Sequence, residues 1–242
     1  MRIILLLFLI PIFGCQKQEK KIAGFKISGN VKNLNNNDLL VLKFVNDGIE
    51  LDSISVLNNE FEYSGSVKEP YFVQLLIKDG NSTKGKLTEF MIENSEIIIE
   101  GKTVDYDSIQ VSGSKSDQIL KHYFKKDAVL RSQWDVLKIE YDEYVAINDS
   151  INKKLIGEKL NSILKIDRVG LLKDYVKENS ESIVGALLPI FCSLENVLTE
   201  KDYQEMYDTL TQKIKETDYG NSLLEKFTVP QNKNTAVELK QS

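Results

Sequence analysis

The first half of the chain alternates between apolar and polar side chains with a period of two. Phe25, Ile27 and Val31 occupy odd positions, with polar or small residues between them. This alternation places one set of side chains on a buried face and the other in water, so it predicts half-buried strands. Two denser apolar runs, 39–45 and 71–77, are typical of central strands.

Short polar segments separate these runs and have the composition of turns. Residues 58–59 are both asparagine, which suits a tight hairpin because asparagine tolerates a positive φ angle. Residues 35–38 and 79–81 are further turn signals, and residues 78–86 match a long hairpin loop. Several short strands with this spacing predict an antiparallel β-sandwich over residues 25–114.

After residue 114 the apolar positions recur at steps of three and four, which is the spacing of one face of a helix. The first stripe consists of Leu120, Phe124, Leu130, Trp134, Leu137, Tyr141 and Tyr144, with one longer gap that follows Phe124. The pattern predicts a long helix that breaks near residues 148–150, where a polar segment suits a helix cap. A second helical stretch then continues to about residue 177.

The last part of the chain carries further helix signals. Thr199 with Asp202 has the form of a capping box, and apolar residues follow it at helical spacing. Pro189 is expected to kink or end the helix in which it lies. We therefore expect an α-helical bundle over residues 115–227 and a disordered tail over residues 228–242. The expected fold class is α+β, with an N-terminal sandwich followed by a C-terminal bundle.

The first fifteen residues have the pattern of an export signal that ends in a cysteine. Arg2 supplies a positive charge, and residues 3–13 form an apolar run typical of a signal-peptide core. Residues 12–15, Ile-Phe-Gly-Cys, are similar to a bacterial lipobox, in which a small residue precedes the lipid-bearing cysteine. Residues 1–14 are therefore predicted to be a lipoprotein signal peptide. The alternative is an ordinary secretory signal whose cysteine is incidental.

Lipidation at Cys15 would anchor the mature chain in a membrane, because two or more acyl chains hold a protein stably in a bilayer. Residues 15–24 would form the lipidated tether. Gln16, where aspartate would mark inner-membrane retention, favours the outer membrane with the protein facing the periplasm. Residues 16–21 loosely resemble a tag for the cell surface, and the alternative is a plain solvated tether. No later apolar run has the length of a transmembrane helix.

Composition excludes some functions. The formal net charge is −5 and the charges are spread along the chain, so no basic face for nucleic acid is predicted. The sequence has two cysteines. With Cys15 lipidated, Cys192 would have no disulfide partner. Its apolar neighbours are expected to raise its pKa and keep the thiol inert.

Candidate catalytic and metal-binding residues are few. His122 is the single histidine, so no histidine-based metal cluster is expected, and it is predicted to be a partly exposed helix residue. Ser112 and Lys115 spell S-x-x-K, but the companion motifs of serine enzymes with that pair do not follow. Residues 105–107, Asp-Tyr-Asp, lack the glycine and glutamate of a calcium loop. We expect no catalytic residue, metal or cofactor.

Four stretches of the strand half form an ordered set of motifs. They are residues 25–31 (FKISGNV), 51–65 (LDSISVLNNEFEYSG), 90–101 (FMIENSEIIIEG) and 111–114 (VSGS). In this order they resemble domain of unknown function 4369, found in envelope lipoproteins of the Bacteroidota. Asn59 stands where that family usually has glycine. The resemblance implies a β-sandwich.

In many such lipoproteins a helical segment follows, and then a thioredoxin-like thiol-disulfide oxidoreductase domain. Residues 115–227 resemble the helical segment more loosely. A thioredoxin-like domain needs an attacking and a resolving thiol in a Cys-x-x-Cys motif, and the sequence contains no such motif. We therefore expect this chain to be without the thioredoxin-like domain and its activity.

The sequence leaves two main hypotheses for function. The first is a non-catalytic, lipid-anchored protein of the cell envelope that acts as a binding or scaffolding module. The alternative is an accessory subunit that recruits a separate thioredoxin-like oxidoreductase. An enzyme that uses carboxylates is a third class, for which the acidic residues show no distinguishing spacing. A polar pocket with aromatic rings between sandwich and helices would favour ligand binding, and a flat apolar patch would favour a protein partner.

Overall fold

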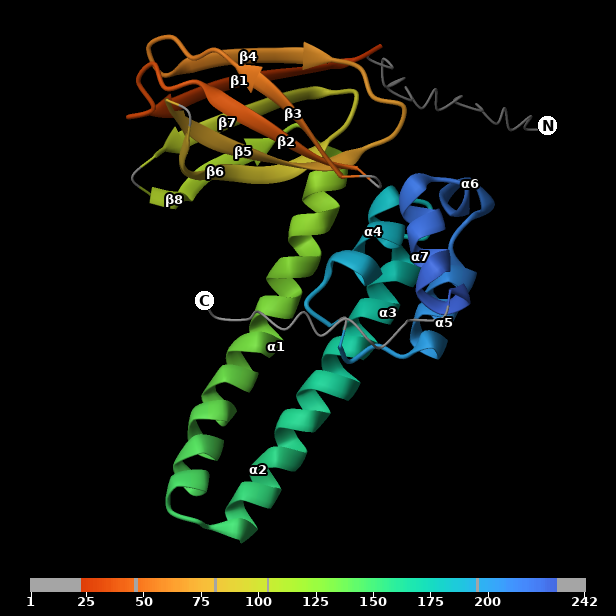
Figure 1. The fold of residues 1–242 in the computed structure, drawn as a ribbon. Coiled ribbons are helices and arrows are strands. Elements are labelled where there is room, and N and C mark those ends of the chain that lie inside the picture. The colour runs from red at the N-terminus through yellow and green to blue at the C-terminus, as the bar shows by residue number, and fades with distance from the viewer. Residues whose placement is uncertain (1–22, 46–47, 81, 104, 195, 230–242) are drawn as a thin grey trace, which may run out of the picture.

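The computed structural model describes residues 23–45, 48–80, 82–103, 105–194 and 196–229. These residues form two β-sheets followed by a helical region (Figure 1). The strands are β1 (Phe25–Lys32), β2 (Leu39–Val45), β3 (Gly48–Ile54), β4 (Glu60–Gly65), β5 (Tyr71–Asp79), β6 (Ser82–Ile92), β7 (Glu96–Lys102) and β8 (Asp105–Ser112). The predicted order of a sandwich followed by helices is confirmed.

The two sheets have the strand orders β4-β1-β7-β8 and β3-β2-β5-β6. The dense apolar runs at 39–45 and 71–77 become β2 and β5, which are the central strands of the second sheet, as predicted. In β1 the residues Phe25, Ile27 and Val31 are buried between the sheets, as the period of two requires. The sandwich core is therefore built from the alternating positions that the sequence shows.

The sandwich is not purely antiparallel, contrary to the sequence-based prediction. Strand β1 pairs with β7 in parallel, from Lys26 opposite Glu96 to Lys32 opposite Lys102. The chain passes from β6 in one sheet to β7 in the other, so no hairpin fixes the direction in which β7 enters. Alternation marks which face of a strand is buried, and it carries no information about strand direction.

The asparagine turns are confirmed. Asn58 and Asn59 have φ angles of 53° and 72°, and the peptide N–H groups of Leu57 and Glu60 donate to each other's carbonyl oxygens at 2.9 and 3.0 Å. The Asn59 N–H also donates to the carbonyl oxygen of Asn35 at 2.8 Å. The Asn35 N–H donates back to the Asn59 side-chain oxygen at 2.8 Å. Two polar turns distant in sequence are thereby joined.

The predicted long loop over residues 78–86 is wrong. Strand β5 continues to Asp79 and β6 begins at Ser82, and these two residues pair directly. The first residues of β6 are exposed, because β6 is an edge strand of its sheet. Exposure explains their polar composition, which the sequence analysis interpreted as a loop.

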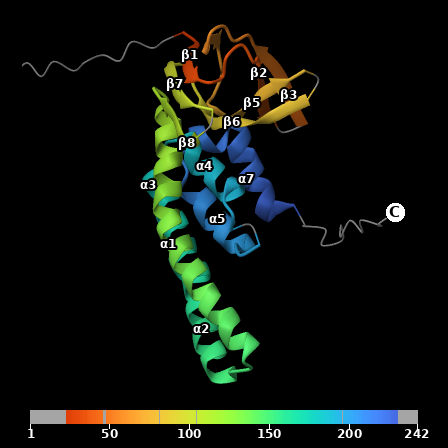
Figure 2. The same ribbon diagram turned by 90° about the vertical axis from the view of Figure 1, so that its left-hand side faces the viewer.

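The helical region contains two long helices and a cluster of shorter ones. The elements are α1 (Lys115–Ala146), α2 (Ser150–Ser162), the π-helical turn η1 (Ile163–Arg168), α3 (Val169–Glu178), α4 (Ile183–Phe191), α5 (Glu200–Thr209), α6 (Gln212–Lys215) and α7 (Asp218–Thr228). Helices α1 and α2 form an antiparallel hairpin whose turn lies far from the sandwich. Helices α3 to α7 lie together beneath the sandwich (Figures 1 and 2).

Each predicted helix signal takes its expected place. Asn148 has a φ angle of 55° at the break after α1, and the Asp149 side chain caps α2 by accepting from the N–H of Asn152 at 3.0 Å. Thr199 begins α5 with a complete capping box. Pro189 lies in the last turn of α4, which ends two residues later.

Two clusters of buried apolar side chains make up the core. One lies between the sheets, and the other lies among the helices. Phe72 and Met91 come from the sandwich but belong to the helical cluster. The sandwich and the helices therefore share a core at the place where they meet, and they pack as one body.

Candidate functional site

The start of α1 is bonded to the end of β6. The Glu93 carboxylate accepts hydrogen bonds from the Lys115 N–H and from the Ser116 hydroxyl, the latter at 2.6 Å. The buried Asp117 carboxylate accepts from the Met91 N–H at 3.2 Å and forms an ion pair with Lys121 at 2.7 Å. Burial raises the pKa of the Asp117 carboxyl, and Lys121 opposes that effect. These contacts fix the direction in which α1 leaves the sandwich.

Helix α7 holds the sandwich at a second place. The Phe72 N–H donates to the Tyr219 hydroxyl oxygen at 3.1 Å, and the Asp218 N–H donates to the Glu69 carboxylate at 3.1 Å. Burial raises the pKa of Tyr219, so the hydroxyl stays neutral at ordinary pH. With the Glu93 contacts, this second attachment prevents the helices from rotating about a single joint.

A cleft of ≈ 890 Å³ lies at this junction. Four segments line it: residues 68–70, the first turn of α1, the turn 178–183 between α3 and α4, and residues 213–217. The charged lining residues are Lys68, Glu69, Lys115, Glu178, Glu181, Lys213 and Glu216. Since both signs of charge are present and no lining residue is aromatic, the cleft suits a polar partner better than an apolar molecule.

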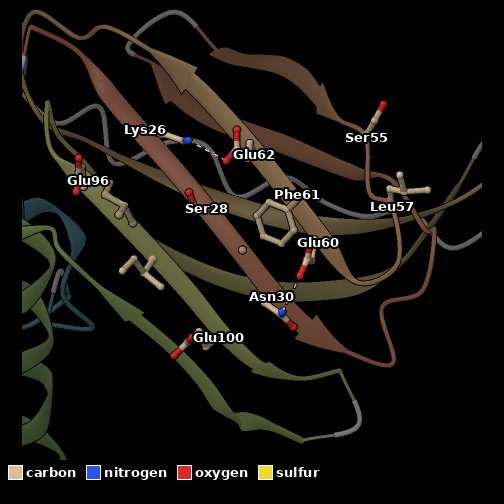
Figure 3. A pocket seen from close by; sticks show the side chains of 13 residues that line it. Lys26, Ser28, Asn30, Ser55, Leu57, Glu60, Phe61, Glu62, Glu96 and Glu100 are labelled. Carbon is tan, nitrogen blue, oxygen red and sulfur yellow. Dashed lines mark hydrogen bonds and ion pairs between the residues drawn. The ribbon is translucent and has the colours of Figure 1, made fainter.

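A second hollow, of ≈ 650 Å³, lies on the outer face of the sheet that contains β1 (Figure 3). Glutamates of β4 and β7 surround it, and Lys26 forms an ion pair with Glu62 at 2.8 Å. Asn30 donates to the Glu60 carboxylate at 3.1 Å. These contacts between neighbouring side chains satisfy much of the polar surface, so we regard the cleft at the junction as the stronger candidate site.

The residues that the sequence singled out are not brought together. Cys15 lies outside the described residues. His122 is exposed on α1, with its Nδ1 atom 3.3 Å from the Tyr175 hydroxyl oxygen. Ser112 ends β8, and the Lys115 N–H is bonded to Glu93. In the described part of the chain, no group of three or more His, Cys, Asp or Glu residues is placed to hold a metal ion.

Cys192 lies just after α4 and is buried. Its thiol donates to the Pro189 carbonyl oxygen at 3.8 Å, and burial raises the pKa of the thiol to about 11. Near neutral pH the group is therefore a protonated thiol, which is a poor nucleophile. The expected raised pKa of Cys192 is confirmed.

We predict that Cys192 reacts with a thiol reagent at pH 8 at least about a hundredfold more slowly in the folded protein than in denaturant, because two pKa units lower the thiolate fraction by that factor. A Cys15→Ser variant leaves Cys192 as the single thiol for the measurement. Equal reaction rates in the folded and unfolded states would show that the Cys192 thiol is accessible, and would contradict its burial as a protonated thiol.

A buried ion pair at the base of the helical hairpin was not predicted from the sequence. Arg168 in η1 donates to the Asp127 carboxylate at 2.6 and 2.9 Å and to the Ser193 hydroxyl at 2.8 Å. Arg131, on the solvent side, also pairs with Asp127 at 3.1 Å. Asp127 interrupts the apolar stripe of α1, and a charged residue in a buried stripe was the available signal.

Comparison with known proteins finds one family model that matches the sandwich. Residues 25–120 match the model of the family described as Domain of unknown function (DUF4369). This match supports the domain that the strand motifs predicted. It also extends into α1 as far as residue 120, which agrees with the bonds that Glu93 makes to the start of that helix. No curated protein matches the chain. Within the described residues, none of the helices combines the length and apolar character needed to cross a bilayer.

Proposed function

We propose that this chain is a non-catalytic protein of the cell envelope, held at the outer membrane by lipid on Cys15, which binds a protein partner in the cleft at the sandwich–helix junction. The observation that carries the proposal is the cleft itself. Glu93 and Tyr219 hold its two sides together, so its shape exists before a partner arrives. A preformed site lowers the ordering cost of binding.

The lining of the cleft indicates what kind of partner it would accept. Lys68 and Lys213 are exposed on two of the lining segments, and Glu178 and Glu181 are both exposed on a third, the turn 178–183. A polypeptide segment that carries both signs of charge would pair with these side chains. Such pairs fix orientation and select a partner more than they add affinity.

The anchor and the cleft are compatible in this proposal. In this proposal the tether over residues 15–24 would join the sandwich, whose first strand begins at Phe25, to the membrane. A ten-residue tether spans at most about 35 Å when fully extended. The body would therefore stay close to the membrane surface, where it could hold another envelope protein.

Site-specific photo-cross-linking in living cells tests the binding site. A photoreactive phenylalanine analogue replaces Glu181, an exposed residue of the cleft, in the full chain. We expect a discrete cross-linked product in the membrane fraction. Lys213→Glu in the same chain should weaken that product, because it reverses a charge of the lining.

The matched control places the same analogue at Glu158, which is exposed on α2 and is not among the residues that line the cleft. Equal products from both positions, or none from Glu181, would contradict a partner in the cleft. The identity of the captured protein also separates the two functional hypotheses. A thioredoxin-like oxidoreductase would favour the accessory-subunit alternative over a general scaffold.

A further inference from the structure

Helix α1 carries a second stripe on the side away from its contact with α2. The stripe consists of Lys125, Val129, Ser132, Val136, Ile139 and Glu143. All six side chains are exposed, and the exposed fractions of Val129, Val136 and Ile139 are 58%, 64% and 64%. The residues follow one another at steps of four, three, four, three and four, which is the spacing of a helix face that packs on another helix.

The spacing of the stripe is symmetric about its centre. The stripe has a charged residue at each end, Lys125 and Glu143, and apolar or small residues between them. The order of steps is also unchanged when it is reversed. A surface with this property can face a second copy of itself across a twofold axis, and twofold pairing is the commonest symmetry of protein dimers.

We propose that α1 of a second copy of this chain docks on the stripe in the antiparallel direction. In this register Lys125 lies opposite Glu143 of the second copy, and Val129 lies opposite Ile139 of the second copy. At the centre, Ser132 of each copy lies opposite Val136 of the other copy. The apolar side chains are then removed from water, which is the main driving force for such association.

The charges at the two ends support a second copy as the occupant. The described residues provide no ion-pair partner for Lys125 or Glu143. Within one chain they are separated by eighteen residues of helix, about 27 Å at 1.5 Å per residue, so they do not meet. The antiparallel register gives each of them an opposite charge on the other copy.

The length of the hairpin fits the same register. With Lys125 opposite Glu143, the hairpin turn at residues 148–150 of one copy reaches the level of residues 118–120 of the other. That level lies just below the sandwich, since α1 begins at Lys115. The second copy would therefore cover the exposed helix without meeting the sheets.

This association does not depend on a partner in the cleft or on the lipid anchor. Its test is the molar mass of the full chain in mild detergent, measured by size-exclusion chromatography with light scattering over a range of concentrations. We expect a dimer. Val136→Glu should weaken it at least about tenfold, because it places a carboxylate at the apolar centre of the contact. Val145→Glu is the matched control, since Val145 is exposed on another side of α1.

Reversing the two charges tests the register. Lys125→Glu and Glu143→Lys should each weaken the dimer about tenfold, by placing like charges opposite each other in both symmetry-related pairs. The double variant K125E/E143K should restore it. A monomeric wild type would overturn the proposal, and it would leave residues 230–242 or another protein as the occupant of the stripe. A dimer that Val136→Glu does not weaken would also overturn it. So would a double variant K125E/E143K that does not restore the dimer.

Discussion

Replacing Arg168 by alanine is expected to lower the free energy of unfolding by about 3–5 kcal/mol, because it leaves the Asp127 carboxylate buried with one side unpaired. Asp127 is 3% exposed and Arg168 is 7% exposed, and two hydrogen bonds join them. Arg131 keeps one contact with Asp127, so we expect a value in the lower part of this range. Urea unfolding followed by the fluorescence of Trp134, the single tryptophan, measures the change.

Two further variants make this prediction specific. Lys138→Ala removes an ion pair with Asp142 that is exposed on both sides, and it should cost no more than about 1 kcal/mol. Replacing both members of the buried pair, Asp127→Leu with Arg168→Met, should recover most of the loss, since no unpaired charge stays buried. Equal losses from Arg168→Ala and Lys138→Ala would show that the buried pair has no special role.

The second large effect is expected at Gly113, between β8 and α1. Gly113 has a φ angle of +92°. A Cβ atom there would lie 1.8 Å from the Glu96 carbonyl oxygen and 3.1 Å from the Ile97 Cα atom. Gly113→Ala therefore combines an unfavourable backbone conformation with a clash against backbone, and it should cost about 2–5 kcal/mol.

Gly80 is the matched control for this substitution. It also has a positive φ angle, +59°, but a Cβ atom at Gly80 would meet nothing within 4 Å. Gly80→Ala should therefore cost only the backbone part, about 1–2 kcal/mol. In the same urea experiment, the loss of unfolding free energy from Gly113→Ala beyond that from Gly80→Ala measures the clash of a Cβ atom at position 113 with the backbone of β7. Equal costs would contradict that close approach.

Local patterns in the sequence predicted much of the fold. The period of two in β1, the asparagine turn at 58–59 and the capping box at Thr199 are decided by residues near one another in the chain. The structure confirms each of them. Strand direction depends on how distant segments meet, so the parallel pairing of β1 with β7 was beyond local patterns.

The candidate site was less predictable than the fold. Its cleft is formed by four segments that are far apart in the sequence, and no local pattern shows that they meet. The Asp127–Arg168 pair joins residues forty-one positions apart. Asp127 was visible as a charge within an apolar stripe, but its partner could not be chosen among the many basic residues of the chain.

The two cysteines have different places in this account. Burial and a raised pKa hold the Cys192 thiol inactive, and Cys15 is proposed to carry lipid. In this proposal neither cysteine takes part in oxidoreductase chemistry. The proposed protein therefore binds its partner at a membrane, where the lipid on Cys15 would hold it.

Metabolic labelling with a clickable fatty acid tests whether Cys15 carries lipid. Cells that express the full chain are grown with the labelled acid, and the purified chain is assayed for the label. The account predicts that the wild-type chain takes up label and that the Cys15→Ser variant takes up none, while Cys192→Ser is labelled as the wild type is. A wild-type chain without label, or a Cys15→Ser chain that keeps it, would contradict the account.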